Sequence, residues 1–167
     1  ETGPVPVLAA VNGAAYGGGC ELVAMADFAY AARHARFAQT EVKLGIIPGA
    51  GGTQNLARAV GERRAKELIL SGQTFTAEQA CEWGLINAVF DSETLLAETL
   101  ASARLIAANG PIAVRQAKQA ISRGMNLSLA DGLAFEIEAY NRTVPTKDRQ
   151  EGVAAFNENR TPNFTGN

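Results

Sequence analysis

The chain has very few of the residues on which several common functions depend. Among its 167 residues, His34 is the only histidine, and Cys20 and Cys81 are the only cysteines. A histidine-based catalytic triad or a multi-histidine metal site is therefore excluded within this chain. The two cysteines form no close motif, which is typical of reduced structural thiols in a cytoplasmic protein. We expect no metal site and a surface position for His34.

An excess of positive charge and a long apolar run are also missing. The formal net charge is -2 and the sequence pI is about 5.5, whereas a dedicated nucleic-acid binder usually presents a basic face. No segment approaches the roughly 18 consecutive apolar residues that are typical of a membrane span. The chain also has no basic segment followed by an apolar signal core. We therefore expect neither nucleic acid nor a membrane as a partner.

An initiating methionine is absent, and the chain runs almost at once into an apolar strand at residues 5–11. This beginning favours the interpretation that an N-terminal portion is missing. Hydrophobic residues make up 47% of the chain, which is enough for a packed core.

The first ninety residues alternate short apolar strands with helical segments, a pattern typical of α/β proteins. Thr76 and Gln79 have the spacing of a capping box, in which each side chain satisfies a free amide at the start of a helix. The pattern predicts strands at residues 5–11, 28–32, 36–38 and 87–90, and helices at 20–25, 53–60, 63–70 and from the capping box to about 84.

Beyond residue 91 the pattern becomes all-helical, with helices predicted at 93–109, 112–123, 128–140 and 147–159. We place a domain boundary there, with an α/β part at 1–91 and a helical part at 92–167. The helical part has more apolar positions than one small core needs, which predicts packing against neighbouring subunits. These positions are Leu95, Leu96, Leu100, Ile112, Val114, Ile121, Leu129, Leu133 and Ile137.

Two glycine-rich stretches, residues 13–19 and 45–52, precede predicted helices. Neither is followed by the Gly-Lys-Ser/Thr of a phosphate-binding loop, and Leu22 and Gln54 stand where the dinucleotide fingerprint requires its third glycine. What remains is a glycine turn before a helix, which directs free backbone amides at one point. Such a point can stabilise a developing oxyanion, and glycine lets a ligand approach the backbone closely.

Two glutamates accompany these stretches. Glu21 falls in the first turn of a predicted helix, where it fits equally well a helix-dipole partner. Glu41 follows a predicted strand, and taken alone it fits a solvated loop carboxylate. Two carboxylates near one oxyanion site indicate acid–base chemistry on a carbonyl compound, without identifying its substrate.

At these residues the chain resembles the crotonase (enoyl-CoA hydratase/isomerase) family. The similarity extends in order over nearly the whole chain, and the paired glycine and glutamate motifs are specific to the family. The matching stretches are residues 9–13, 17–22, 37–39 with Glu41, 44–54, 70–72, 83–86 and 148–156 with Arg160.

The resemblance implies a role for each matched residue. Gly18 matches the glycine whose amide binds the thioester oxygen, and Glu21 and Glu41 match the two catalytic glutamates that hold and activate water. Gly49 matches a glycine that positions this water. Tyr140 and Phe156 fall where the family places aromatic residues near the acyl and CoA pocket.

The resemblance also implies a fold and a reaction. We expect a partial crotonase-type ββα spiral core followed by a helical oligomerisation region. The implied reaction is reversible addition of water to 2-enoyl-CoA thioesters in fatty-acid or branched-chain amino-acid breakdown. No cofactor is implied, because coenzyme A is part of the substrate. The implied assembly is a homo-oligomer, a trimer or a dimer of trimers.

Three other interpretations remain open at this point. One is an enoyl-CoA isomerase of the same fold, and another is a non-catalytic trimeric or RNA-associated relative. The third is an inactive fragment, because the family's N-terminal portion carries the second oxyanion amide and has no counterpart here. Residues 143–149 are also similar to the methylglutaconyl-CoA hydratase subgroup, some members of which bind RNA through a lysine-rich helix in that portion.

Overall fold

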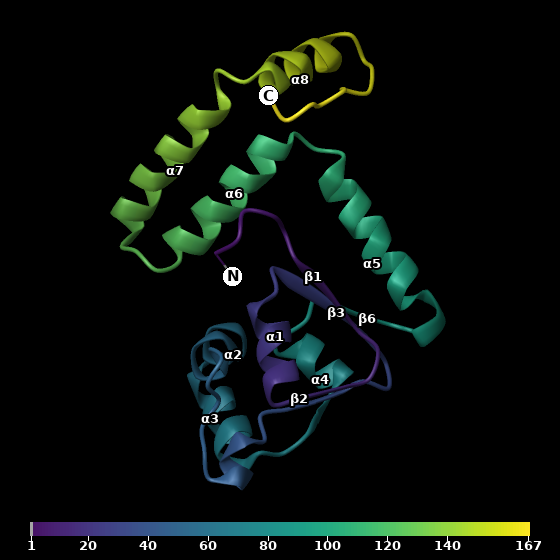
Figure 1. Ribbon diagram of the computed structural model, residues 1–167, viewed down its shortest axis with the longest axis vertical. Helices are drawn as coiled ribbons and strands as arrows, with labels where there is room; N and C mark the ends of the chain where they lie inside the picture. Colours follow the sequence, from purple (N-terminus) through teal and green to yellow (C-terminus); the bar gives the residue numbers. More distant parts are fainter. Residues whose placement is uncertain (1) are drawn as a thin grey trace. The chain divides into compact units, whose positions relative to one another are not determined.

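The computed structural model describes residues 2–167 and divides the chain into two compact units. One unit comprises residues 7–101, and the other comprises residues 102–167 with the described residues 2–6. Figure 1 follows the chain through both. The units divide within helix α5 (Ser92–Ala107), whereas the domain boundary expected from the sequence lies at the start of that helix.

Six short strands form two three-stranded sheets in the unit of residues 7–101. In the first sheet all neighbours are parallel, and Leu8 pairs with Phe28 and Tyr30 with Ala88. In the second, β2 runs parallel to β4, and β4 runs antiparallel to β5. The first sheet contains β1 (Leu8–Val11), β3 (Phe28–Ala32) and β6 (Ala88–Phe90), and the second contains β2 (Ala14–Tyr16), β4 (Arg36–Ala38) and β5 (Phe75–Thr76).

Helices connect these strands and enclose an apolar core. Phe37 and Phe75 stack with ring centroids 5.6 Å apart, and Leu56 and Leu68 are fully buried beside them. Burying a side chain of this size stabilises the fold by about 1.5–3 kcal/mol. The helices are α1 (Gly18–Met25), a 3₁₀ helix η1 (Glu41–Leu44), α2 (Gly52–Val60), α3 (Glu62–Ser71) and α4 (Ala77–Glu82), followed by the first part of α5.

The predicted α/β pattern is confirmed, with local differences that have physical causes. The strand expected at 5–11 begins only at Leu8, because Pro6 has no amide to donate and Val5 and Val7 are exposed. Strand β2 lies inside the stretch interpreted as a glycine turn, since pairing with β4 extends its three residues. The capping box is present, with Gln79 N donating to Thr76 Oγ1 at 3.2 Å and Thr76 N to Gln79 Oε1 at 2.9 Å.

The other unit consists of helices with well-formed starts. The Ser128 hydroxyl accepts from Asp131 N at 3.2 Å, and the Thr146 hydroxyl accepts from Arg149 N at 3.1 Å. Two helices approach closely where Gly124 meets Gly132. A Cβ atom added to Gly132 would lie 3.5 Å from the Cα atom of Gly124. After the end of α5, the unit contains α6 (Pro111–Gly124), α7 (Leu129–Thr143) and α8 (Lys147–Asn157), with α6 packed against α7 (Figure 1).

The C-terminal segment folds back onto the start of α8. Asp148 is 5% exposed, and its carboxylate accepts from Thr165 N at 2.7 Å and from Gly166 N at 2.8 Å. Arg160 donates to both carboxylate oxygens of Glu151, at 2.6 and 3.0 Å. Hydrogen bonding from Arg160 lowers the pKa of Glu151 to about 2. Because this pair is exposed, solvent screening limits its contribution, and Asp148 provides the stronger anchor.

Six of the nine apolar positions singled out in the helical part are exposed, Ile112 and Val114 are half-buried, and Leu95 is buried. Leu95 is only 2% exposed and belongs to the interior of its own unit, so its expected role in subunit packing is wrong. By contrast, Ile121, Leu129 and Ile137 are exposed. Across residues 2–167, no helix combines the length and the apolar character needed to cross a membrane.

We predict that Asp148→Ala lowers the free energy of unfolding by about 2 kcal/mol, because the part-buried amides of Thr165 and Gly166 lose a charged acceptor. Chemical denaturation with urea measures this change, and hydrogen exchange at Thr165 and Gly166 should accelerate. Glu136→Ala is the matched control, since Glu136 is an exposed carboxylate on α7 and its loss should cost less than 0.5 kcal/mol. Equal effects of the two substitutions would contradict the anchoring role of Asp148.

Candidate active site

The turn between β2 and α1 places a row of free amides at one point. Gly17 has φ 54° and ψ -124°, a conformation that glycine adopts readily, and its amide donates to Ala38 O at 2.9 Å. Helix α1 therefore begins directly at Gly18, two residues earlier than the sequence predicted. A Cβ added to Gly18 would meet no atom within 4 Å. The backbone there is open to a ligand, as the amide of an oxyanion site requires.

Glu21 lies one turn into α1 and is held by the second glycine loop. Its side chain is 4% exposed, and its Oε1 accepts from Ala50 N at 2.7 Å and Gly52 N at 2.8 Å. Gly52 is the first residue of α2, so this carboxylate lies at the N-terminal end of that helix. Both hydrogen bonds and the helix dipole direct partial positive charge at this carboxylate. The Glu21 carboxylate therefore binds the start of α2, in addition to lying in the first turn of its own helix.

Glu41 reaches the same place from the start of η1. It is half-buried, and a Cβ on Gly17 would lie 3.3 Å from its Oε1. The sequence suggested a solvated loop carboxylate as one alternative, but this side chain lies beside the turn that opens α1. Gly18, Glu21 and Glu41 are therefore neighbours in space, although twenty-three positions separate the first from the last.

Gln39 is a site residue to which sequence reasoning assigned no role. It follows β4 and is 0% exposed, and with its nitrogen turned toward Glu41 it donates to both carboxylate oxygens, at 3.1 and 3.2 Å. A Cβ on Gly52 would come within 2.8 Å of the Gln39 amide and 2.9 Å of Glu21 Oε1. The signal in the sequence that could have identified Gln39 was its place as a polar residue directly after the apolar Phe37 and Ala38.

A buried thiol completes the surroundings of the two carboxylates. Burial raises the pKa of Cys20 to about 12, and the nearby Glu41 and Glu21 add to this rise. Cys20 therefore stays neutral near pH 7 and adds no third negative charge between the glutamates.

The remaining predicted site residues lie elsewhere in the chain. Gly49 is exposed in the loop before α2, and a Cβ on it would meet nothing within 4 Å. Tyr140 on α7 and Phe156 on α8 are exposed and belong to the unit of residues 102–167. Their places in a substrate pocket, and the positioning of water by Gly49, stay predictions.

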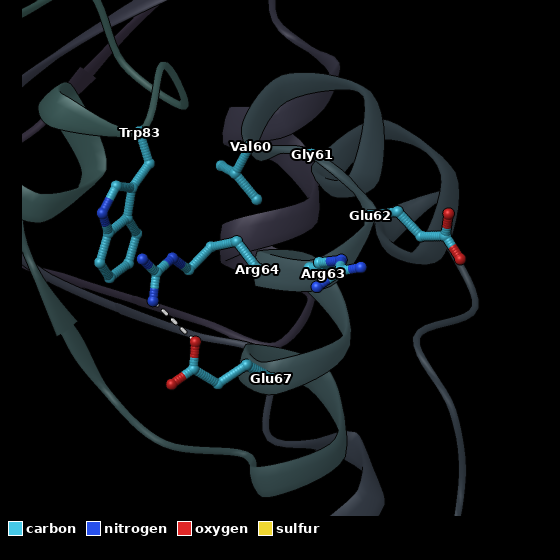
Figure 2. A pocket seen from close by; sticks show the side chains of 7 residues that line it. All are labelled: Val60, Gly61, Glu62, Arg63, Arg64, Glu67 and Trp83. Atoms are coloured by element: carbon cyan, nitrogen blue, oxygen red, sulfur yellow. Dashed lines mark hydrogen bonds and ion pairs between the residues drawn. The ribbon is translucent and has the colours of Figure 1, made fainter.

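A surface cavity of about 650 Å³ lies apart from these carboxylates, at the start of α3. Figure 2 shows Arg64 between Trp83 and Glu67, with the guanidinium carbon 4.3 Å from the indole ring centre and a 2.7 Å ion pair to Glu67. The opposite charges of Arg64 and Glu67 are therefore already paired. None of the cavity's lining residues is among those expected to carry the chemistry.

The site as a whole combines helix N-terminal amides with two carboxylates of different environment. Within the described part of the chain, no three His, Cys, Asp or Glu side chains are grouped so that they could hold a metal ion. The arrangement can stabilise negative charge on an oxygen near Gly18 while protons move to and from the glutamates.

Comparison with known proteins identifies the family to which this arrangement belongs. The enoyl-CoA hydratase/isomerase family model matches residues 1–167. A 2,3-dehydroadipyl-CoA hydratase of Escherichia coli (strain K12) is 45% identical over 161 residues, which are 96% of this chain and 63% of the relative. A short-chain-enoyl-CoA hydratase of Clostridium acetobutylicum is 46% identical over 155 residues, 93% of this chain and 59% of the relative. The chain belongs to the enoyl-CoA hydratase/isomerase family.

Solved structures agree with the expected fold class. The crystal structure of an enoyl-CoA hydratase from Bacillus anthracis superposes with a TM-score of 0.96 at 50% identity, over 98% of this chain and 64% of that one. An enoyl-CoA hydratase from Mycobacterium tuberculosis H37Rv superposes with a TM-score of 0.95 at 36% identity. The crotonase-type α/β core is thereby confirmed. The chain spans about two thirds or less of the length of these relatives.

We predict that Gly52→Ala destabilises the protein by about 1–3 kcal/mol, because the new methyl group would overlap the Gln39 amide and Glu21. Gly13→Ala is the matched control, since a Cβ there meets nothing within 4 Å and its φ lies outside the left-handed range. The control should leave stability unchanged or raise it by less than 1 kcal/mol. Urea denaturation compares the two, and equal stabilities would contradict the close packing at Gly52.

Proposed function

We propose that the protein is an enoyl-CoA hydratase, which adds water reversibly across the C2–C3 double bond of a 2-enoyl-CoA thioester. The observation that carries the proposal is the convergence of Glu21 and Glu41 beside the N-terminal amides of α1. The hydratase names of the relatives support the same reaction. The chemistry is acid–base throughout and calls for no metal or redox cofactor.

The Gly18 amide is proposed to bind the thioester oxygen. Addition at C3 pushes negative charge onto this oxygen as the enolate develops. An amide aimed at that charge lowers the barrier, and losing one such donor typically costs ~3 kcal/mol of transition-state stabilisation. The start of α1 provides this donor from backbone alone.

The different surroundings of the two glutamates indicate which one acts as the base and which as the acid. Two backbone amides donate to Oε1 of Glu21, which leaves Oε2 for a water molecule. Glu21 therefore acts as the base that deprotonates water for attack at C3. Glu41 has no backbone donor among the hydrogen bonds of residues 2–167, so it is the better group to carry the proton to C2.

The second candidate is an enoyl-CoA isomerase of the same fold, which the mixed family name allows. Moving a double bond needs one group to carry a proton between two carbons, whereas hydration needs both a base and an acid. The retention of two adjacent carboxylates favours hydration. A protein of this fold with only a structural role would need neither carboxylate.

The partners proposed are an acyl-CoA thioester and further copies of the same protein in the cytoplasm. Helix α7 supports the second, because Leu129, Leu133, Ile137 and Tyr140 recur along one face and are all exposed. An apolar stripe of this kind is usually covered by a partner. We propose a trimer or a dimer of trimers, with Tyr140 and Phe156 near the acyl-CoA pocket.

We predict that Glu21→Gln and Glu41→Gln each lower kcat for crotonyl-CoA hydration by ~10²-fold or more, since each removes an acid–base group. KM should change little, because the amide keeps the shape of the site. The double variant should be impaired far less than the product of the two single effects, because both groups serve one transition state. Steady-state kinetics on the full-length protein measure all three.

Glu82→Gln is the control for these variants, since Glu82 is an exposed carboxylate of α4 and should have no effect. Near wild-type hydration by Glu21→Gln would show the two-carboxylate assignment to be wrong. If the wild-type protein isomerised a 3-enoyl-CoA and hydrated nothing, the isomerase would replace the hydratase.

We predict that Ile137→Glu shifts the full-length protein toward monomers, because a charge on the apolar face of α7 opposes its burial between subunits. Light scattering at micromolar concentration measures the mass. Glu138→Lys is the control, because Glu138 is exposed and lies about 100° around the helix from Ile137, away from this stripe, and its change should leave the mass unchanged. A monomeric wild-type protein would contradict the proposed assembly.

A further inference from the structure

The amide of Gln39 is enclosed on every side yet has no role in the scheme above. Its side chain is 0% exposed, and a buried amide must find hydrogen-bond partners within the protein. One end of the amide faces the Glu41 carboxylate, and the same amide lies against Gly52, whose own N–H binds Glu21. Gln39 is therefore placed between the two carboxylates.

The orientation of this amide depends on the charge of Glu41. With its nitrogen toward Glu41, Gln39 donates to Oε2 at 3.1 Å and Oε1 at 3.2 Å, which suits an ionised carboxylate with two acceptor oxygens. The opposite orientation places the amide oxygen against carboxylate oxygens, where only a protonated Glu41 could donate to it. The nitrogen-first orientation therefore favours the ionised form of Glu41.

No cation competes for this role in the part of the chain that the structure describes. None of the ion pairs of residues 2–167 involves Glu41. Lys43 is close in sequence, but its side chain lies over Gly72, where a Cβ would come within 2.8 Å of it. The nearby Cys20 thiol, whose pKa is raised by burial and by Glu41 and Glu21, is neutral and supplies no positive charge.

We propose that Gln39 is a positioning residue that acts through Glu41, by donating two hydrogen bonds to the carboxylate that forms when Glu41 gives its proton to C2. The inference rests on the proposed hydratase function. As the proton leaves, negative charge appears on Glu41, and donors already aimed at that charge stabilise the transition state. In the reverse reaction the same bonds hold the carboxylate in place to take up the C2 proton.

The test replaces Gln39 by methionine, which keeps the length of the side chain and removes both donors. In the full-length protein, Gln39→Met should lower kcat for crotonyl-CoA hydration roughly 10- to 100-fold, with KM within about twofold of wild type. The alkaline limb of the pH profile of kcat should move to higher pH, because Glu41 holds its proton more strongly without these donors. Leu68→Met is the control, since Leu68 is a fully buried side chain of the apolar core and has no polar atoms.

A second variant separates hydrogen bonding from packing. Gln39→Glu can donate one hydrogen bond to Glu41 while its own carboxyl is protonated, and it repels Glu41 once ionised. Its kcat should therefore exceed that of Gln39→Met at acid pH and fall below it at alkaline pH. If Gln39→Met keeps the wild-type pH profile and behaves like Leu68→Met, the residue only fills space and the inference is overturned.

One further measurement remains informative if the wild-type protein hydrates no enoyl-CoA, a result that would defeat the proposed function by itself. The carboxyl carbon signal of Glu41, labelled with ¹³C and assigned with Glu41→Gln, is followed by NMR as pH is raised. Gln39→Met should shift the protonation of Glu41 to higher pH. Identical titration curves in Gln39→Met and wild type would overturn the role of Gln39.

Discussion

The contact on which the site depends is that of the Glu21 carboxylate with the amides of Ala50 and Gly52. It joins α1 to the start of α2, two helices that follow different glycine stretches. A buried carboxylate without partners would be costly, and two short hydrogen bonds from a helix start remove that cost. The absence of a side chain at Gly52 is part of the same contact, because a Cβ there would occupy the space of Glu21.

The second constraint is the parallel pairing of β2 with β4, which brings the two glycine stretches together. Gly17 follows β2 and Gln39 follows β4, and the hydrogen bond from Gly17 N to Ala38 O joins the ends of the two strands. Because β2 and β4 are parallel, the segments that follow them leave the sheet at the same edge, and Glu41 lies beside the start of α1. Phe37 of β4 and Phe75 of β5 stack in the apolar core of the same unit.

The surroundings of the two glutamates differ for reasons that follow from these contacts. Glu21 accepts hydrogen bonds from two backbone amides, whereas the donor beside Glu41 is the Gln39 side chain when its nitrogen is turned toward that carboxylate. Cys20 lies near both and is neutral. This difference is the basis on which Glu21 is proposed as the base and Glu41 as the acid, because backbone amides bind only Glu21.

Much of this protein could be read from its sequence. The alternation of short apolar runs with helices predicted the α/β unit, and Thr76 with Gln79 predicted the start of α4, because these signals are local and involve neighbouring residues. The glycine stretches and the two glutamates were found by motif, and the family followed from them. What the residues alone left open was whether Glu21 and Glu41 meet and what holds each.

Tertiary structure decided those points, because they depend on pairings between distant segments. Strand β2 is three residues long and exists through its pairing with β4, so its own sequence carried too weak a signal. Leu95 looked like an interface residue from its place in the helical part but is buried within its own unit. Gln39 gained significance only where its amide meets Glu41 and Gly52. Local pattern determined the elements, and the close approach of residues far apart in sequence determined the site.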